Sequence, residues 1–299
     1  MLLFATTAFA GSGPWSLSQG ALTVYVGVEV QRFHLVAPVM GGEVLEADTG
    51  GPIVQTGAKL IATVGIVHGV EAELTVPYYR VEATVTAPGA CTDFPNDPCA
   101  TTTGLGLIEV RTKWQVLDEL ASSPLSVAIG PRLRLGSHTA DTRDRLTNLG
   151  EGTDDLGLFA AAGRTARVGN AQLELGYWHR PVTSWSPRAP HDEWTLEFAA
   201  HLAPSPVVSF GPLVYGLWRP GGVDFDGVDF ELDDRFAMLS VLNGRAGVEV
   251  VVRDAKRGVS LVGSVVRTVV VRNNPSDQWI ASVGIGAYNP FRRAVAGAP

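Results

Sequence analysis

The stretch 104–136 constrains the fold more than any other part of this chain, because its side chains alternate strictly in character. In its first half one set of alternate positions is mostly apolar and holds Ile108, Val110, Thr112, Trp114 and Val116. The positions between them are polar and hold Glu109, Arg111, Lys113 and Gln115. The segment 125–136 repeats the pattern, with Arg132 and Arg134 on its polar side. A period of two over roughly a dozen residues predicts two long β-strands, each with one charged face. Such a hairpin is typical of a membrane-spanning barrel with its charges turned inward, although a soluble sandwich alternates too.

The same alternation recurs along the chain and predicts about twelve strands. The expected segments are 21–35, 53–66, 70–85, 104–117, 125–136, 155–167, 171–180, 192–202, a segment ending at 219, 238–252, 259–271 and 277–288. Short turns alternate with long polar loops at every connection except the last. An even strand count with loop lengths sorted in this way is typical of an all-β, antiparallel transmembrane barrel. We therefore expect periplasmic turns, extracellular loops and both termini on the periplasmic side.

Composition agrees with a barrel and argues against other classes. Hydrophobic residues make up 45% of the chain and the mean hydropathy is +0.15, yet no run of apolar residues is long enough for a transmembrane helix. A lipid-facing barrel spreads its apolar residues over alternate positions. The net charge of -7 comes without any basic run, so nucleic acid is not an expected partner.

The ends of the chain and its two cysteines give further expectations. Residues 1–10 resemble the apolar part of a secretory signal peptide, and we expect cleavage after Ala10. The positively charged region that should precede it is missing, so either the true start lies upstream or the resemblance is accidental. We expect a single barrel domain over 11–291 and a C-terminal tail over 292–299. Cys91 and Cys99 lie in one loop and fit a local disulfide in an oxidising compartment, with two free thiols as the alternative.

Aromatic residues mark the ends of several expected strands. Belts at the two membrane interfaces would collect such side chains, although ordinary packing at sheet edges would also explain them. The candidates are Tyr78, Trp114, Trp178, Trp185, Trp194, Trp218, Trp279 and Phe291.

The inward-facing charges are the strongest candidates for function. A charge on the lipid face costs about 2–4 kcal/mol at mid-membrane, so the charged parity is expected to face the lumen. The candidate pore-lining residues are Lys59, Glu73, Glu109, Arg111, Lys113, Arg132, Arg134, Glu174, Glu197, Arg245 and Arg267, and Glu29, Glu71 and Glu249 share the same parity. In the otherwise apolar segment 259–271, Arg267 is the residue from which we assign the inward and outward faces, with Arg267 expected to point inward. These groups either line a wet channel or pair with one another and close it.

Catalysis finds little support in the sequence. None of the six histidines precedes a serine at the two-residue spacing of an outer-membrane phospholipase. The His191-Asp192 pair at a strand end is typical of a solvated loop, and no nucleophile elbow or phosphate-binding loop occurs. The acidic loop 224–234 departs from the EF-hand spacing, and we expect it to be solvated, with a bound divalent cation as the alternative. We expect no cofactor.

Several short motifs occur in a recognisable order. They are His68-Gly69-Val70-Glu71 after a hydrophobic strand, Leu74-Thr-Val-Pro-Tyr78, Gly104-Leu-Gly106, Lys113-Trp114 and Gly176-Tyr177. In this order the chain resembles the outer-membrane barrels grouped under the meta-pathway of phenol degradation, a family of proposed transporters. The resemblance implies passive transport of small, hydrophobic or aromatic solutes.

Two functions follow as hypotheses. The first is an outer-membrane channel for a small-molecule solute, surrounded by outer-membrane lipid and lipopolysaccharide. The alternative is a structural or surface-interaction barrel with a closed, charge-paired lumen. A hydrolase ranks behind both, and the oligomeric state is open.

Overall fold

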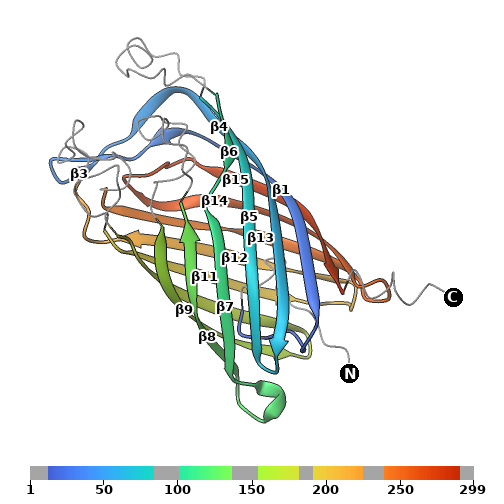
Figure 1. The fold of residues 1–299 in the computed structure, drawn as a ribbon. Helices are drawn as coiled ribbons and strands as arrows, with labels where there is room; N and C mark the ends of the chain where they lie inside the picture. The colour runs from blue at the N-terminus through green and yellow to red at the C-terminus, as the bar shows by residue number, and fades with distance from the viewer. Residues whose placement is uncertain (1–12, 84–100, 137–153, 182–190, 225–238, 290–299) are drawn as a thin grey trace.

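The chain forms one closed antiparallel β-barrel in a computed structural model that describes residues 13–83, 101–136, 154–181, 191–224 and 239–289 (Figure 1). Its long strands are β1 (Leu22–Val36), β4 (Ala47–Val67), β5 (Val70–Ala83), β7 (Ile108–Leu117), β8 (Ser126–Leu135), β9 (Asp155–Ala166), β10 (Gly169–His179), β11 (Glu193–Leu202), β12 (Val208–Arg219), β13 (Val241–Asp254), β14 (Val259–Arg272) and β15 (Trp279–Tyr288). Consecutive strands pair, and β1 closes the barrel on β15 from Thr23↔Tyr288 to Arg32↔Trp279. Closure gives each of these long strands two neighbours in the sheet. None of the described residues forms a helix long and apolar enough to span a membrane.

The expected number of strands is confirmed. Two strands, β6 (Thr101–Leu105) and β7, both pair with β5 and are parts of one crossing. The thirteen strands that the described residues contribute to the barrel sheet therefore make twelve crossings. The break between β6 and β7 falls at Gly106, where a Cβ atom would lie 2.7 Å from the Tyr79 ring. Sequence alternation continues across this position and gave no sign of the break.

The largest difference from the expected boundaries is at β4. This strand begins at Ala47, whereas the sequence predicted a loop over 37–52 because that segment is rich in glycine and acidic residues. The end of β1 continues to pair with it beyond an irregularity between Phe33 and Leu35. The small hairpin β2 (Val39–Met40) and β3 (Glu43–Val44) fills the rest of the connection. Pairing with a neighbour thus overrides the local turn preference.

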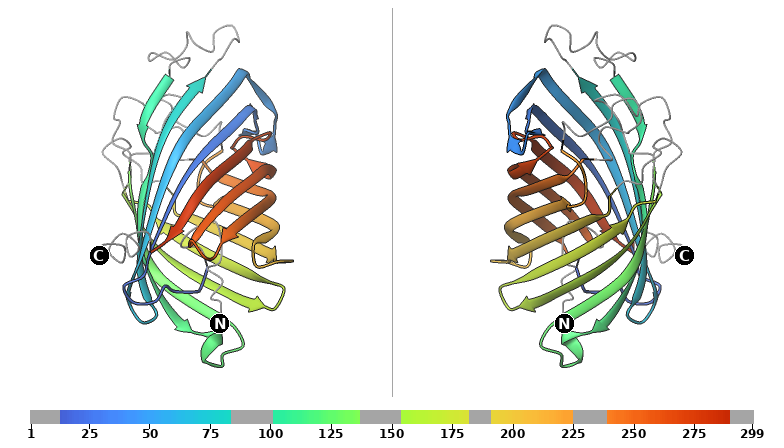
Figure 2. Two further views of the ribbon diagram at one scale, coloured as in Figure 1. Left: turned by 90° about the vertical axis from the view of Figure 1, so that its right-hand side faces the viewer. Right: turned by 90° about the vertical axis from the view of Figure 1, so that its left-hand side faces the viewer.

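Loop lengths are sorted between the two ends of the barrel as predicted. The tight connections 68–69, 118–125, 167–168, 203–207 and 255–258 lie at one end (Figure 1). The start of β1 and the end of β15 lie there too, since the Asn289 N–H donates to the Leu22 carbonyl at 2.6 Å. The connection 273–278 is short and lies at the opposite end. The side views show the strands inclined to the barrel axis (Figure 2), the tilt that closure requires.

The outer surface of the barrel is apolar between two levels of aromatic residues. Exposed Val, Leu and Ile side chains cover it, including Val28, Leu158 and Ile285. Exposed aromatics toward the long-loop end are Tyr78, Trp194, Trp218 and Trp279, and those toward the short-turn end are Trp114, Phe210 and Tyr288. The eight residue steps from Phe210 to Trp218 on β12 span roughly 26 Å of strand, or about 20 Å across the membrane at a tilt of ~40°. This spacing suits the apolar band of an outer-membrane barrel.

Some expectations fall on residues that the structure does not describe. These are the signal segment 1–10, the C-terminal tail 292–299, Cys91 and Cys99, Trp185 and Phe291, and most of the acidic loop 224–234.

The expected inward position of Arg267 is wrong. On β14 the buried side chains are those of Val262, Val266 and Thr268, so Arg267 is on the outer face. Its guanidinium carbon lies 5.2 Å from the centroid of the Trp279 ring. The prediction assumed that a charge on the lipid face is always costly. Near the membrane interface this cost falls to about 0–1 kcal/mol, and Arg267 is the ninth residue of its strand.

Candidate functional site: the barrel interior

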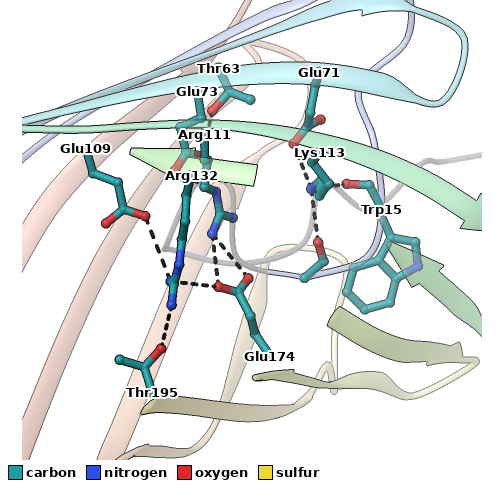
Figure 3. A network of polar contacts seen from close by, with 11 residues as sticks. Trp15, Thr63, Glu71, Glu73, Glu109, Arg111, Lys113, Arg132, Glu174 and Thr195 are labelled. Carbon is teal, nitrogen blue, oxygen red and sulfur yellow. Dashed lines mark hydrogen bonds and ion pairs between the residues drawn. The ribbon is translucent and has the colours of Figure 1, made fainter. Parts of the chain in front are cut away.

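The barrel interior holds a continuous network of buried charges. The opposed positions on β5 and β7 carry Glu71 with Lys113 and Glu73 with Arg111. Their closest atoms are 2.7 Å apart in the first pair and 3.2 Å in the second, and all four side chains are at most 8% exposed. Opposite charges directly across two strands stabilise the pairing. The period-two pattern therefore places these residues together by register alone (Figure 3).

A second contact crosses the interior instead of following neighbouring strands. Arg111 Nη1 donates to both carboxylate oxygens of Glu174 at 3.1 and 3.2 Å. Because β8 and β9 lie between β7 and β10 in the sheet, this interaction joins strands that are not neighbours. Arg132 Nη1 lies 3.9 Å from Glu174 and 4.0 Å from Glu109, and its Nη2 donates to the Thr195 hydroxyl at 2.9 Å (Figure 3). Glu174 thus connects two arginines from different strands.

A tryptophan supports the arginines of β8. The guanidinium carbons of Arg132 and Arg134 lie 4.0 and 4.1 Å from ring centroids of Trp178, whose side chain is fully buried. The expectation that Trp178 belongs to an interfacial belt is therefore wrong. It has the inward parity of Glu174 on β10. Stacking on an aromatic face favours Arg over Lys and holds the guanidinium in a fixed plane.

Toward the long-loop end the network continues with four further interactions. Arg134 lies 3.5 Å from Asp155 and 3.2 Å from Glu193. Glu193 also accepts from Arg219 Nη2 at 3.0 Å, and Arg180 lies 3.7 Å from Asp155. All of these carboxylates are buried. The charged wall therefore extends from β5 around to β12.

The remaining part of the wall is less charged and more apolar. One buried cluster contains Tyr25, Ile61, Val251 and Val262, from β1, β4, β13 and β14. A second contains Ala199, Leu213 and Val266, with Tyr215 and Ile280 packed against it. The interior thus has two chemically different sides.

Two ionic contacts accompany the apolar clusters. Lys59 lies 3.7 Å from Glu29, and His201 Nε2 lies 2.8 Å from Glu249. The first pair is about one-fifth exposed, whereas the second is almost completely buried. Arg245 on β13 also faces the interior, opposite Tyr215 of β12. Charged groups therefore occur on this side as separated pairs and not as a continuous network.

Residues 13–20 form a segment inside the barrel that we call the N-terminal strap. Lys113 Nζ donates to the carbonyls of Gly13 and Trp15 at 3.0 and 2.7 Å (Figure 3). The Glu71 carboxylate accepts from the Leu17 N–H at 2.7 Å. Because Lys113 and Glu71 point into the barrel, the strap lies against its inner wall. The same ion pair therefore holds the strap and joins β5 to β7.

Further contacts fix the strap at the short-turn end. Gln115 Oε1 accepts from the N–H and the hydroxyl of Ser16 at 2.9 and 2.8 Å. The Trp15 indole N–H donates at 2.8 Å to Glu119, in the turn between β7 and β8. A Cβ atom on Gly163 of β9 would lie 2.9 Å from the Trp15 ring, so glycine is needed there for the close approach. The strap therefore runs across the inner faces of β9, β7 and β5.

The structure brings together most of the predicted interior residues. Glu73, Glu109, Arg111, Lys113, Arg132, Arg134 and Glu174 belong to the network. Lys59 and Arg245 lie on the inner face outside it, Glu197 lies on the inner face beside it, and Arg267 lies on the outer face. Glu197 is directly opposite Glu174.

Sequence reasoning missed Trp178, Thr195, Asp155, Glu193 and the strap. Parity alone could have found Trp178 and Thr195, since each shares its side with an expected inward glutamate. Asp155 and Glu193 are the first residues of β9 and β11 and lie within the expected segments 155–167 and 192–202, but they were not counted among the inward charges. The strap has no alternation, so nothing in its sequence reveals that it enters the barrel.

The His191-Asp192 pair has a structural role. Asp192 accepts hydrogen bonds from the Tyr177 hydroxyl and from the Arg180 N–H, and contacts the His179 ring at 3.1 Å. Burial raises the pKa of Asp192, but these hydrogen bonds outweigh it and lower the pKa below its usual value. Asp192 therefore ties the end of β10 to the start of β11. Among the described residues no group of His, Cys, Asp and Glu could hold a metal ion.

No protein-family model and no curated protein matches the sequence. Solved structures do share its fold. The COG4313 outer membrane channel from Pseudomonas putida F1 is 14% identical, with a TM-score of 0.69, and the match covers 91% of this chain and 97% of that one. The NanC porin is 8% identical, with a TM-score of 0.52, over 88% of this chain and 98% of that one. The chain therefore has the fold of a bacterial outer-membrane β-barrel, and these neighbours are a channel and a porin and not enzymes.

Proposed function

We propose that this barrel is a passive channel for small organic solutes that combine an apolar or aromatic body with polar oxygen atoms. The main support for this proposal is the division of the interior into a charged wall and an apolar wall. Tyr215 and Ile280, which are partly exposed and pack on the buried Leu213 and Val266, offer contact to an apolar body. On the other side Arg111 Nη2, Arg132 Nε and Trp178 Nε1 are buried donors with no protein partner among the described residues. A solute that satisfies both walls is better matched than a salt ion or a sugar.

The names of the two fold neighbours, a channel and a porin, also support transport. Their low sequence identity carries no information on the solute. The earlier family resemblance, to transporters of the phenol meta-pathway, agrees with an aromatic solute and remains part of the proposal.

The strap gives the channel its constriction at the periplasmic end. It occupies the inner wall beside Lys113 and Glu71, and its Trp15 ring packs against Gly163. Removing residues 13–18 would take this segment out of the path without altering any strand. We expect the deletion to raise single-channel conductance in planar bilayers by at least twofold. A conductance equal to that of the intact chain would show that the strap does not limit passage.

Transport itself is tested with protein refolded into liposomes and planar bilayers. We expect measurable conductance and a faster uptake of benzoate than of arabinose, a sugar of similar size. Neutralising Arg132 and Arg134 together should shift the reversal potential toward cation selectivity, because two positive charges leave the charged wall. A barrel without conductance and without uptake of either solute would refute the channel.

The second candidate is a structural barrel with a charge-paired, closed interior. The nearly complete burial of the Glu73, Arg111 and Glu174 side chains favours it. The deletion of the strap separates the two candidates. A channel becomes more conductive without the strap, whereas a barrel that is closed by its charge network shows no conductance with or without it.

A further inference from the structure

The outer face carries one cluster that the transport proposal does not use. Arg32 of β1, Trp279 of β15 and Arg267 of β14 are direct cross-strand partners, in that order. All three side chains are exposed, and Trp279 is 50% exposed. Neighbouring strands are about 4.8 Å apart, so the two arginines flank the indole at about 10 Å from each other. Their long side chains can converge on one group above the ring.

The cluster lies where the apolar band ends toward the long-loop side. Below it the outward residues of the same strands are apolar, namely Val28, Val265 and Val283. Above it Asp277 is engaged by the His34 ring and by the backbone N–H groups of His34 and Leu35. Arg and Trp at this level match the head-group region of the outer leaflet.

Among the described residues, no carboxylate neutralises the positive charges of the cluster. Neither Arg32 nor Arg267 forms an ion pair with a carboxylate in the part of the chain that the structure describes. Among the charged and aromatic side chains described there, Arg267 contacts the Trp279 ring alone. Arg80, a third outward arginine toward the same end, is paired with Glu82. Asp277, two residues before Trp279 in the chain, is already engaged by the His34 ring and by two backbone N–H groups. Two guanidinium groups are thus available to an external anion.

We propose that Arg32, Trp279 and Arg267 bind a phosphate group of the phosphorylated glycolipid of the outer leaflet, lipid A. Guanidinium groups bind phosphate through paired, charge-assisted hydrogen bonds. The acyl chains of the same lipid would lie on the valines below the cluster, and the indole would lie at the level of its sugar. A free anion would not gain this apolar contact. The inference depends on the outer-membrane location of the barrel and is independent of transport.

The test compares lipid A that carries both phosphates with lipid A from which they have been removed, added to the full chain in detergent micelles. Native mass spectrometry gives the fraction of protein with bound lipid at each concentration. We expect the phosphorylated lipid to bind at least tenfold more tightly, since charge-assisted hydrogen bonds to two arginines distinguish the two lipids. The R32A/R267A double variant should lose this preference, and W279A should weaken it.

Arg80→Ala is the matched control, because it removes an outward arginine toward the same end that already has a partner. It should keep the tenfold preference. Heat-modifiable migration on gels shows that each variant is folded, so a lost preference cannot be mistaken for a lost barrel. Equal binding of the two lipids by the wild-type chain, or an unchanged preference in R32A/R267A, would overturn the proposal.

Discussion

Glu174→Gln tests whether the interior network stabilises the barrel as one unit. The carboxylate of Glu174 accepts two hydrogen bonds from Arg111 at 3.1 and 3.2 Å and lies 3.9 Å from Arg132, and its side chain is 5% exposed. After the substitution Arg111 keeps its ion pair with Glu73 at 3.2 Å, whereas Arg132 keeps a longer one with Glu109 at 4.0 Å and its hydrogen bond to Thr195. Removing one partner of a buried pair costs about 3–5 kcal/mol. Because glutamine retains one acceptor oxygen, we expect a loss of about 3 kcal/mol.

The matched control is Glu29→Gln, the same substitution in a looser interior pair. Glu29 lies 3.7 Å from Lys59, and the two side chains are 18% and 26% exposed. Solvent screens such a pair, so we expect a loss of about 1 kcal/mol or less. Urea unfolding in lipid vesicles, followed by tryptophan fluorescence, measures both free energies. Equal losses for the two variants would refute the idea that burial of the network sets its contribution to stability.

Two further outcomes follow from the structure and a third from the sequence. Trp178→Leu removes the ring that stacks on two arginines and should lower the free energy of unfolding by about 3 kcal/mol in the same assay. A loss below about 1 kcal/mol would count against a stabilising role of the stacking. Arg267→Gln should leave the reversal potential unchanged, because Arg267 faces outward. A shifted reversal potential would indicate that Arg267 faces the lumen. Mass spectrometry of unreduced protein should find Cys91 and Cys99 in one cross-linked peptide, and two alkylated thiols would disprove the disulfide.

The sequence by itself determined the barrel and most of its inner face. The lipid tolerates apolar side chains and the interior tolerates charged ones, so a period of two appears in the sequence wherever a strand crosses. This pattern was sufficient to place Glu73, Arg111 and Glu174 inside. It was insufficient at Arg267, because the cost of an outward charge depends on depth in the membrane. Depth is known only once the strands are aligned and the aromatic levels are visible.

Only the tertiary structure decided which interior charges meet. The contact of Arg111 with Glu174 joins strands separated by two others, and the contact of Lys113 with Gly13 and Trp15 joins a strand to a segment without any pattern. Alternation specifies the side of a sheet on which a residue lies and register specifies its neighbour. Neither specifies what lies across a closed barrel, because those distances follow from its curvature. The pairing of charges across the interior, and the strap that lies among them, are therefore properties of the closed structure alone.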